Sequence, residues 1–350
     1  MENTINRVSG DEIKRFIIDV MIKAGVPPAD AEIEADVLVW ANMRGVDSHG
    51  VLRIPLYVDY LRDGIMNPNP NIQVINETPA TVFIEADNAL GPVVTKMAMN
   101  IVMEKARNVG MGWGLIRNTS HQGAMAYYSL MAAEQGMAGI ASVCSPPNMV
   151  PYGAKSAGVH NSPIAIAVPG LNHKPISLDM ATSVVAGGKL DLAKDKGEAI
   201  PDNWAVDSNG NPTTDPNLKA ALLPIAGPKG AGLALMFECL SSLMVGNPLL
   251  QPRQENKSRI KIGMQNSFIA AVNIATFTDL NEYREDVDRI VDGIKSLPRA
   301  DGADEIFLPG EPENRVYEDR SVNGIPLPVG TIKNLREVAL RLDVKLPVGI

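Results

Sequence analysis

The segment 138–145 constrains the fold more than any other part of the chain. Within it, Gly139-Ile140-Ala141-Ser142-Val143-Cys144 is apolar or small at successive positions rather than at alternate ones. A strand with this pattern is buried on both faces. Helical patterns precede and follow it, so the sequence predicts an α/β protein whose central sheet is covered by helices on both sides.

The other apolar patterns predict a chain that begins with helices and then alternates between helix and strand. Ser9-Gly10-Asp11-Glu12 is a capping box, and apolar residues at helical spacing follow it as far as Gly25. Two short runs, 71–76 and 81–85, predict a hairpin or an edge pair. The other expected helices are 29–44, 51–64, 90–109, 124–135, 183–196, 233–245, 281–296 and 331–341, and the other expected strands are 112–116, 163–168, 176–180 and 267–277.

Two segments lack such a pattern. The segment 251–258 is polar, and we expect an exposed, mobile loop there. The segment 298–326 is rich in Pro and Gly and predicts a long connection of the kind that covers a site.

The bulk properties of the chain exclude several classes of protein. Its 350 residues predict about two domains, and its formal net charge is −8. No Lys/Arg cluster could neutralise a row of phosphates and no apolar run approaches the roughly 18 residues of a membrane span, so we expect neither nucleic acid nor membrane as a partner. Cys144 and Cys239 lie in apolar runs and indicate no disulfide framework. Because the first seven residues show no secretory signal, the expected location is cytoplasmic.

A histidine lies where a predicted strand gives way to a predicted helix. His121 is part of Arg117-Asn118-Thr119-Ser120-His121-Gln122-Gly123-Ala124, which follows the strand 112–116. Ligands bind at strand ends in open α/β sheets. Since His exchanges a proton near neutral pH, His121 is a candidate acid–base residue, although a lone histidine is more often structural.

A second polar cluster lies within ten residues near the N-terminus. Arg44, Ser48, His49 and Arg53 combine two guanidinium groups with an imidazole. Arginine offers bidentate geometry to a planar anion, so this cluster could receive a carboxylate. A helix end with solvated arginines is an equally good interpretation of the same residues.

Two more segments carry polar or glycine-rich patterns. Asp179 ends the strand 176–180 before Met180 and Ala181, and ordinary N-capping is the simpler explanation for it. Gly227-Pro228-Lys229-Gly230-Ala231-Gly232 opens a helix, whose N-terminus favours phosphate. It is not a Walker motif, because Lys229 precedes Gly230, and the chain has no Rossmann glycine fingerprint. We expect His160 and His173 at the surface and no metal site.

Four segments together resemble the malate/L-lactate dehydrogenase family, which is unrelated to the Rossmann-type dehydrogenases. They are 44–50 with Arg53, 120–124, 178–182 and 227–232. The resemblance covers nearly the whole chain. Within the family, 200–207, 212–216 and 221–224 are most similar to the ureidoglycolate dehydrogenases of allantoin breakdown. Asp47 departs from that branch, which has a different polar residue there.

The resemblance implies oxidation of a 2-hydroxy acid with a nicotinamide cofactor, NAD or alternatively NADP. The favoured reaction is ureidoglycolate to oxalurate in purine (allantoin) catabolism. His121 matches the family's catalytic His, Ser48 and His49 belong to its substrate-side motif, and Arg53, assisted by Arg44, would bind the substrate carboxylate. Positions that match cofactor contacts are Ser145, Asp179, Met180, Ala181, Lys229, Gly230, Pro309, Gly310 and Glu311.

The resemblance also implies a division of the chain and a subunit partner. Residues 116–277 would bind the cofactor, and 1–115 with 278–350 would form a substrate and dimerisation domain. We expect a homodimer or a higher homo-oligomer, because the opening helices carry more apolar side chains than one small domain needs. Those side chains are Ile13, Phe16, Ile17, Trp40, Leu56 and Tyr57.

Two alternatives to the ureidoglycolate assignment remain. One is a malate, L-lactate or sulfolactate dehydrogenase of the same family. The other is a protein without enzymatic activity that binds an organic acid through Arg44 and Arg53.

Overall fold

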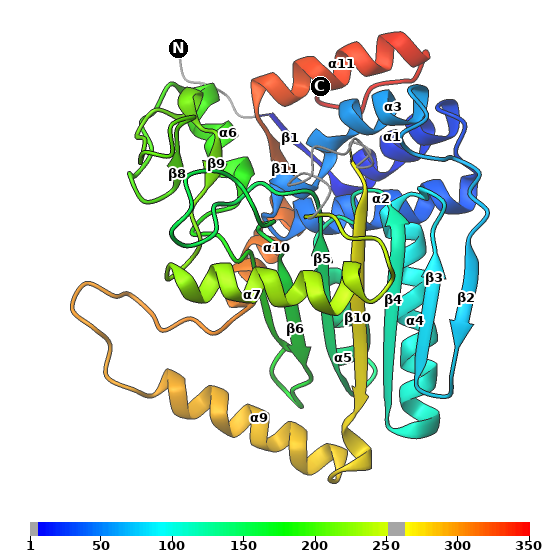
Figure 1. Ribbon diagram of the computed structural model, residues 1–350, viewed down its shortest axis with the longest axis vertical. Helices are drawn as coiled ribbons and strands as arrows, with labels where there is room; N and C mark the ends of the chain where they lie inside the picture. The colour runs from blue at the N-terminus through cyan, green and yellow to red at the C-terminus, as the bar shows by residue number, and fades with distance from the viewer. Residues whose placement is uncertain (1–5, 251–262) are drawn as a thin grey trace.

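The computed structural model describes residues 6–250 and 263–350. Its centre is a mixed seven-stranded sheet of order β2-β3-β4-β10-β5-β6-β7 (Figure 1). The strands are β2 Gln73–Glu77, β3 Thr81–Glu85, β4 Met111–Thr119, β10 Gln265–Asn273, β5 Met137–Cys144, β6 Ile164–Val168 and β7 Ile176–Met180. Only β3 and β4 run parallel; the other neighbours in this sheet are antiparallel. The expected edge pair is confirmed as β2 and β3.

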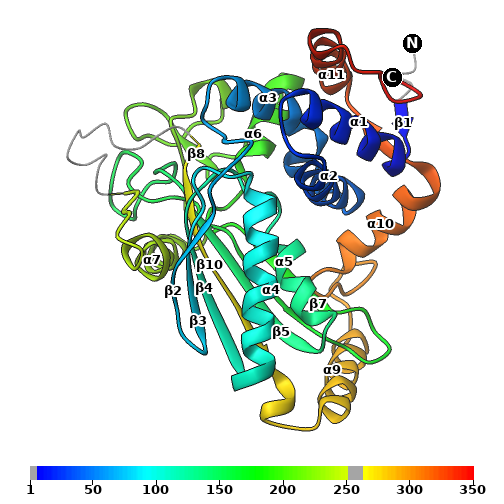
Figure 2. The same ribbon diagram turned by 90° about the vertical axis from the view of Figure 1, so that its right-hand side faces the viewer.

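Helices cover both faces of the sheet, as the apolar run 138–145 predicts (Figure 2). One face packs on α4 (Gly91–Val109) and α5 (Ala126–Ala133) through side chains such as Ile84, Ile116 and Ile269. The other face packs on α7 (Pro228–Glu238) and the π-helical turn η4 (Cys239–Leu243) through Phe237 and Phe268. The predicted α/β class with a covered central sheet is therefore confirmed.

Two glycines in the strands let these helices approach closely. A Cβ atom on Gly112 in β4 would lie 2.1 Å from the carbonyl oxygen of Val102, and one on Gly139 in β5 would lie 2.2 Å from that of Ser129. No larger residue has room at either position, so the sequence sets the distance between the sheet and α4 or α5.

The opening helices form a second core together with the end of the chain. This core joins α1 (Gly10–Lys23), α2 (Pro28–Met43) and α3 (Ile54–Arg62) to α11 (Val329–Leu342), and β1 (Asn6–Val8) pairs antiparallel with β11 (Ile325–Leu327). Four of the six apolar residues that suggested a subunit contact are buried here within one protomer: Ile13, Phe16, Ile17 and Tyr57. That reason for expecting a dimer is wrong, while the dimer itself stays a prediction.

A third, smaller core lies between β5 and α7 in the sequence. It contains α6 (Gly187–Lys196), the short pair β8 (Ala205–Val206) and β9 (Ala221–Leu222), and the 3-10 turn η3 (Pro216–Leu218). The first residues of α6 lie against the segment that carries Ser48, because a Cβ atom on Gly188 would be 2.7 Å from Ser48 Cβ.

The segment after β10 differs from its expectation. It contains η5 (Ile274–Thr276), α9 (Leu280–Lys295) and a connection to α10 (Glu311–Asn323), which β11 follows. The prediction of a long connection over 298–326 is therefore wrong for its second half, which α10 and β11 occupy. The expected loop 251–258 lies outside the described residues.

The expected domain boundary at residues 115 and 116 falls inside β4. β2 and β3, expected in the substrate domain, belong to the same sheet as β4 and β10. A division into cofactor and substrate parts remains a prediction. In residues 6–250 and 263–350, no helix is both long and apolar enough to cross a bilayer.

Candidate active site

The carboxyl ends of three strands lie along the same edge of the sheet, the one formed by strand ends. β4 and β5 both pair antiparallel with β10, and β5 and β7 both pair antiparallel with β6, so the carboxyl ends of β4, β5 and β7 share that edge. His121 follows β4, Ser145 follows β5, and Asp179 lies at the end of β7. The topology thus gathers candidates that are far apart in the sequence.

His121 is half-buried and is held through its Nδ1 atom. Tyr57 Oη lies 2.6 Å from Nδ1, and the Gly123 N–H donates a weaker hydrogen bond to Nδ1 at 3.3 Å. Gly123 has a φ of 73°, a left-handed conformation that glycine adopts without strain and that turns the chain from β4 toward α5. Nε2 has no hydrogen-bond partner in the described part of the chain, so it is available to a substrate.

The substrate-side motif lies directly against this imidazole, on two 3-10 turns, η1 (Asp47–His49) and η2 (Val51–Arg53). The rings of His49 and His121 stack with centroids 5.3 Å apart and an interplanar angle of 28°. Ser48 Oγ lies 2.9 Å from His49 Nδ1, and Arg53 Nε donates to the Ser48 carbonyl at 2.6 Å. The terminal nitrogens of Arg53 have no partner among the described residues, which leaves them free for an anion.

Burial keeps the imidazoles of this cluster neutral. It lowers the pKa of His121 well below the ordinary value, and the nearby His49, Arg53 and His160 lower it further. Burial and the charge of Arg53 lower the pKa of His49 to about 4. At neutral pH, His121 is therefore an uncharged imidazole, the charge state that a general base requires.

His160 belongs to the same cluster, so its expected surface position is wrong. Burial lowers its pKa to about 3, and its Nδ1 lies 3.2 Å from Ser162 Oγ. The segment around it is rich in turns, which suggested exposure, but the neighbouring Val159 is buried and forms a bridge with Met149. His173 is exposed, as expected, and its Nε2 lies 2.9 Å from Asp292 Oδ1.

Arg44 is not beside Arg53. Its guanidinium lies over the Trp40 ring, donates to Asn314 Oδ1 at 2.6 Å, and approaches the Gly310 carbonyl at 3.5 Å. The structure thus places Arg44 with the candidate cofactor residues of the turn before α10. Burial lowers its pKa, and the neighbouring Glu313 and Asp179 partly offset this effect.

Asp47 is an anchor for the motif rather than a group facing His121. The guanidinium group of Arg320, in α10, donates to both carboxylate oxygens of Asp47 at 2.6 and 2.9 Å. Asn42 Nδ2 also donates to Asp47 Oδ1 at 2.7 Å. This bidentate pair fixes η1 to α10. The departure from the ureidoglycolate branch therefore has a structural role in this chain.

Asp179 caps a helix, though not the one that follows it in the sequence. Its Oδ2 accepts the Ala126 N–H, the first amide of α5, at 3.0 Å. The side chain is accessible to solvent but surrounded by protein on its other sides, and this partial burial raises its pKa to about 6. Asp179 therefore ties the end of β7 to the helix that follows His121.

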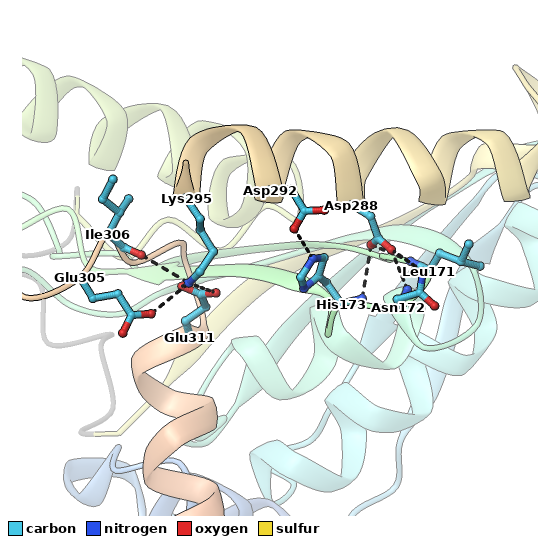
Figure 3. Close-up of polar contacts among 9 residues, drawn as sticks. All are labelled: Leu171, Asn172, His173, Asp288, Asp292, Lys295, Glu305, Ile306 and Glu311. Atoms are coloured by element: carbon cyan, nitrogen blue, oxygen red, sulfur yellow. Dashed lines mark hydrogen bonds and ion pairs between the residues drawn. The ribbon is translucent and has the colours of Figure 1, made fainter. Parts of the chain in front are cut away.

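The turn 308–311 is held by a lysine of α9 (Figure 3). Lys295 Nζ donates to both oxygens of Glu311 at 2.7 and 2.8 Å, and the Leu308 N–H donates to Oε2 at 2.9 Å. Glu311 is thus committed to the turn itself. Pro309 and Glu311 line a cavity of about 230 Å³ between α9 and α10, which none of His121, Ser48, His49 and Arg53 lines.

The remaining cofactor candidates gather between β7 and α7. A Cβ atom on Gly230 would lie 2.5 Å from the carbonyl oxygens of Thr182 and Ile225, so the segment after Met180 and Ala181 packs tightly on the start of α7. The amides of residues 229–231 donate to carbonyls of the loop before the helix, so they are not free for phosphate. Lys229 is exposed and has no ion pair in the described part of the chain, and it fits a phosphate contact.

Tyr57 is a site residue that the sequence did not indicate, because it was grouped with the apolar side chains that suggested a subunit contact. It is buried, yet its hydroxyl is the closest polar group to His121. The missed signal is its spacing: Tyr57 lies four residues after Arg53, so a helix beginning there places both side chains on one face.

The fold and this cluster are those of an α/β protein equipped for acid–base chemistry on a small anion. The chain matches the malate/L-lactate dehydrogenase family over residues 8–336. It is 40% identical to the L-sulfolactate dehydrogenase of Methanocaldococcus jannaschii, with 95% of this chain and 96% of that protein covered. It is 32% identical to the ureidoglycolate dehydrogenase (NAD(+)) of Escherichia coli O157:H7, with 92% of each covered.

A solved structure agrees with these relatives. The malate dehydrogenase of Pyrococcus horikoshii OT3 superposes with a TM-score of 0.89 at 36% identity, over 98% of this chain and 97% of that one. The chain belongs to the malate/L-lactate dehydrogenase family, whose members are named as dehydrogenases of 2-hydroxy acids. The names of these relatives imply a nicotinamide cofactor.

Proposed function

We propose that this protein oxidises a 2-hydroxy acid, and reduces the corresponding 2-oxo acid, with His121 as the acid–base residue. The observation that supports the proposal best is the free Nε2 of His121 beside the free terminal nitrogens of Arg53. A secondary alcohol loses a proton from oxygen when it becomes a ketone, and a neutral imidazole near that oxygen accepts the proton.

The neighbouring groups suit the remaining requirements of this reaction. Arg53 holds the substrate carboxylate in a bidentate contact and thereby directs the hydroxyl toward His121. His49 and Ser48 offer hydrogen bonds to the reacting oxygen. The partner of the reaction is a nicotinamide, which accepts or supplies the hydride when bound.

The candidate cofactor residues fit a dinucleotide at the end of β7. Asp179 offers an accessible carboxylate for hydroxyl or amide groups, and Lys229 offers an exposed cation for phosphate. Arg44 is near enough to Asp179 for that carboxylate to raise its pKa, and it approaches the Gly310 carbonyl at 3.5 Å. We propose NAD as the cofactor, because the E. coli relative is named for NAD(+), with NADP as the alternative.

For the substrate we rank malate and sulfolactate first, and ureidoglycolate second. The relatives named for sulfolactate and malate share more identical residues with this chain than the relative named for ureidoglycolate does.

A substrate panel tests the proposal. Ureidoglycolate, malate, lactate and sulfolactate are each mixed with the protein and with NAD or NADP, and the absorbance of the reduced nicotinamide is followed. We expect turnover of at least one substrate, fastest with malate or sulfolactate. Binding of these acids without any absorbance change would favour the non-enzymatic organic-acid-binding alternative.

A further inference from the structure

The turn between β3 and α4 runs beside the residues that lead into His121. β3 and β4 pair in parallel, and hydrogen bonds between the two segments continue after β3 ends. The Ala86 N–H donates to the Arg117 carbonyl at 2.9 Å, and the Asn88 N–H donates to the Asn118 carbonyl at 2.7 Å. The turn and the end of β4 therefore form one structure, although the whole of α4 separates them in the sequence.

Both segments hold non-glycine residues in the left-handed backbone conformation. Asp87 has a φ of 51°, and Asn88 and Asn118 each have a φ of 56°. In the described part of the chain five residues other than glycine have a positive φ, and three of them lie here. Asp and Asn tolerate this conformation better than other residues, but it still costs free energy, and residues held in this way cluster at functional sites. A costly backbone shape is thus kept where His121 leaves the sheet.

Ser120 joins the two segments directly before His121. The residue is 2% exposed, and its hydroxyl donates to the Ala89 carbonyl at 2.8 Å and accepts the Gly91 N–H at 3.1 Å. The Ser120 N–H donates to the same Ala89 carbonyl at 3.1 Å. Gly91 is the first residue of α4, and Leu90, at the N-cap position, makes no side-chain hydrogen bond. The serine before His121 therefore caps α4 from a distant part of the sequence.

Gly91 leaves room for the peptide of His121 itself. A Cβ atom on Gly91 would lie 2.2 Å from the His121 carbonyl oxygen and 2.6 Å from Gln122 Cα, whereas Cβ atoms essentially never come within 3.0 Å of another heavy atom. Thr95, also in α4, places its hydroxyl within hydrogen-bond distance of Gln122 Oε1, at 2.9 Å. The residues before and after His121 are thus both tied to the start of α4, and the carbonyl of the histidine lies against Gly91.

We propose that Gly91 and Ser120 are positioning residues, which hold the backbone of His121 so that its ring meets the substrate in one orientation. The inference rests on the proposed function. Tyr57 contacts the ring at Nδ1, and the contacts with α4 fix the peptide that carries the ring. With both ends of the residue fixed, Nε2 keeps one direction. Because a misplacement of about 1 Å can cost about 10²-fold in rate, these contacts affect turnover as well as stability.

Two glycines in the contact between α4 and β4 separate positioning from packing. Gly91→Ala forces the His121 peptide away from α4, so kcat should fall about 10²-fold. Substrate KM and the dissociation constant of NADH should stay close to the parent, because Arg53 and the candidate cofactor residues belong to other segments. Gly112→Ala is the matched control, since its Cβ atom would lie 2.1 Å from the Val102 carbonyl oxygen of the same helix. It should lower the melting temperature comparably and leave kcat close to the parent.

Ser120→Ala tests the same contact without adding an atom, and it decides the question if Gly91→Ala does not fold. The change removes the hydroxyl that bridges Ala89 and Gly91. We expect kcat to fall about tenfold with KM little changed. Ser129→Ala is the control, because it removes another buried hydroxyl, one that donates to the Ala126 carbonyl, and it should keep the parental kcat.

Nuclear magnetic resonance of the free protein reports on the ring without substrate or cofactor. The chain has four histidines, so the signals of the 15N-labelled His121 ring can be assigned by single substitutions. These signals should shift in Gly91→Ala and in Ser120→Ala, because the ring moves relative to the Tyr57 hydroxyl. They should match the parent in the two control variants.

The combined measurements distinguish the possible outcomes. If kcat falls in the same proportion to the melting temperature in all four variants, Gly91 and Ser120 only pack and the proposal is wrong. It is also wrong if Ser120→Ala matches the parent in both kcat and the His121 ring signals. Shifted ring signals together with a parental kcat would instead overturn His121 as the acid–base residue of the proposed function.

Discussion

Arg53 precedes α3, and among the described residues a hydrogen-bond partner is found for its Nε alone. Its Nε donates to the Ser48 carbonyl, so the flat edge formed by the other two nitrogens is presented in a defined orientation. Lysine would keep the charge but would lose both this anchor and the bidentate geometry.

Arg53→Lys should therefore raise KM by at least about tenfold while kcat changes less. Steady-state kinetics with the best substrate of the panel measure both KM and kcat. Arg62→Lys, an exposed position of α3 that pairs with Asp59 and Asp63, is the control and should leave KM unchanged. A KM for Arg53→Lys within about twofold of the parent would show that Arg53 is a solvated helix residue.

The burial of Glu34 in α2 leads to a prediction about how stability depends on pH. Burial raises its pKa from 4.5 to about 8, so between these values the native state holds a proton that the unfolded chain has lost. The contribution of Glu34 to the free energy of unfolding is therefore largest below about pH 4.5. It falls as pH rises from 4.5 to 8 and is smallest above about pH 8. Since one pKa unit is worth about 1.4 kcal/mol, the loss is on the order of a few kcal/mol.

Urea unfolding at a series of pH values measures this slope. Glu34→Gln cannot ionise, so its free energy of unfolding should fall less than that of the parent between about pH 5 and pH 8. The exposed Glu32→Gln should follow the parent. If the free energy of unfolding depends on pH in the same way for the parent and for Glu34→Gln, the pKa of Glu34 is not raised to about 8.

At the scale of the element, the sequence predicted what local apolar patterns can specify. β5, β7, α1 and α4 follow from apolar runs or helical spacing, and their observed bounds differ from the expected ones by a few residues at most. α10 was missed because it has no apolar stripe: none of its residues is buried. It is held by partners far away in the sequence, such as Asp47 for Arg320 and Lys295 for Glu311.

The candidate site shows the same limit. His121, Ser48, His49 and Arg53 were predicted from motifs that lie within short segments, and the structure brings them together. Arg44 was assigned to the same group by nearness in sequence, whereas the end of α2 directs it to Asn314. The place of His160 depends on how distant segments pack, which local spacing does not specify.

The first turn of α7 gives a prediction at this scale. A Cβ atom at Gly230 would meet two backbone carbonyl oxygens at 2.5 Å, whereas one at Gly232 would meet nothing within 4 Å. Gly230→Ala should therefore displace the start of α7, lower the melting temperature and weaken cofactor binding. Gly232→Ala should be neutral or stabilising by about 0.5–1 kcal/mol, because alanine favours a helix interior over glycine. Equal melting temperatures for the two variants would contradict the packing described here.

At the scale of the whole molecule, α7 and η4 present an apolar surface that no other described residue of the protomer covers. α7 and η4 bury one face on the sheet, and their outer face exposes large apolar side chains at helical spacing. They are Leu233, Met236, Leu240, Leu243 and Met244. A helix that is apolar all round is normally buried on all sides, so we expect a second copy of the chain to cover this face.

Light scattering should give a mass of at least twice 37.5 kDa at micromolar concentration. Met236→Lys should shift the mass toward the monomer, whereas Leu340→Lys, an exposed apolar position on α11, should not. A mass of 37.5 kDa for the parent would refute the dimer, and a dimer unaffected by Met236→Lys would place the interface elsewhere.

The most direct test of the account is the kcat of His121→Ala. Removal of a general base costs about 10²–10⁴ in rate, so kcat should fall at least about a hundredfold while NAD(H) binding and the melting temperature stay close to the parent. His173→Ala, at an exposed histidine paired with Asp292, should retain full activity. The parental kcat/KM should fall only well below pH 6.5, where His121 becomes protonated, and this acidic limb should be absent from any residual activity of the variant. Oxidation by His121→Ala at close to the parental rate would contradict the account and make His49 the next candidate for the base.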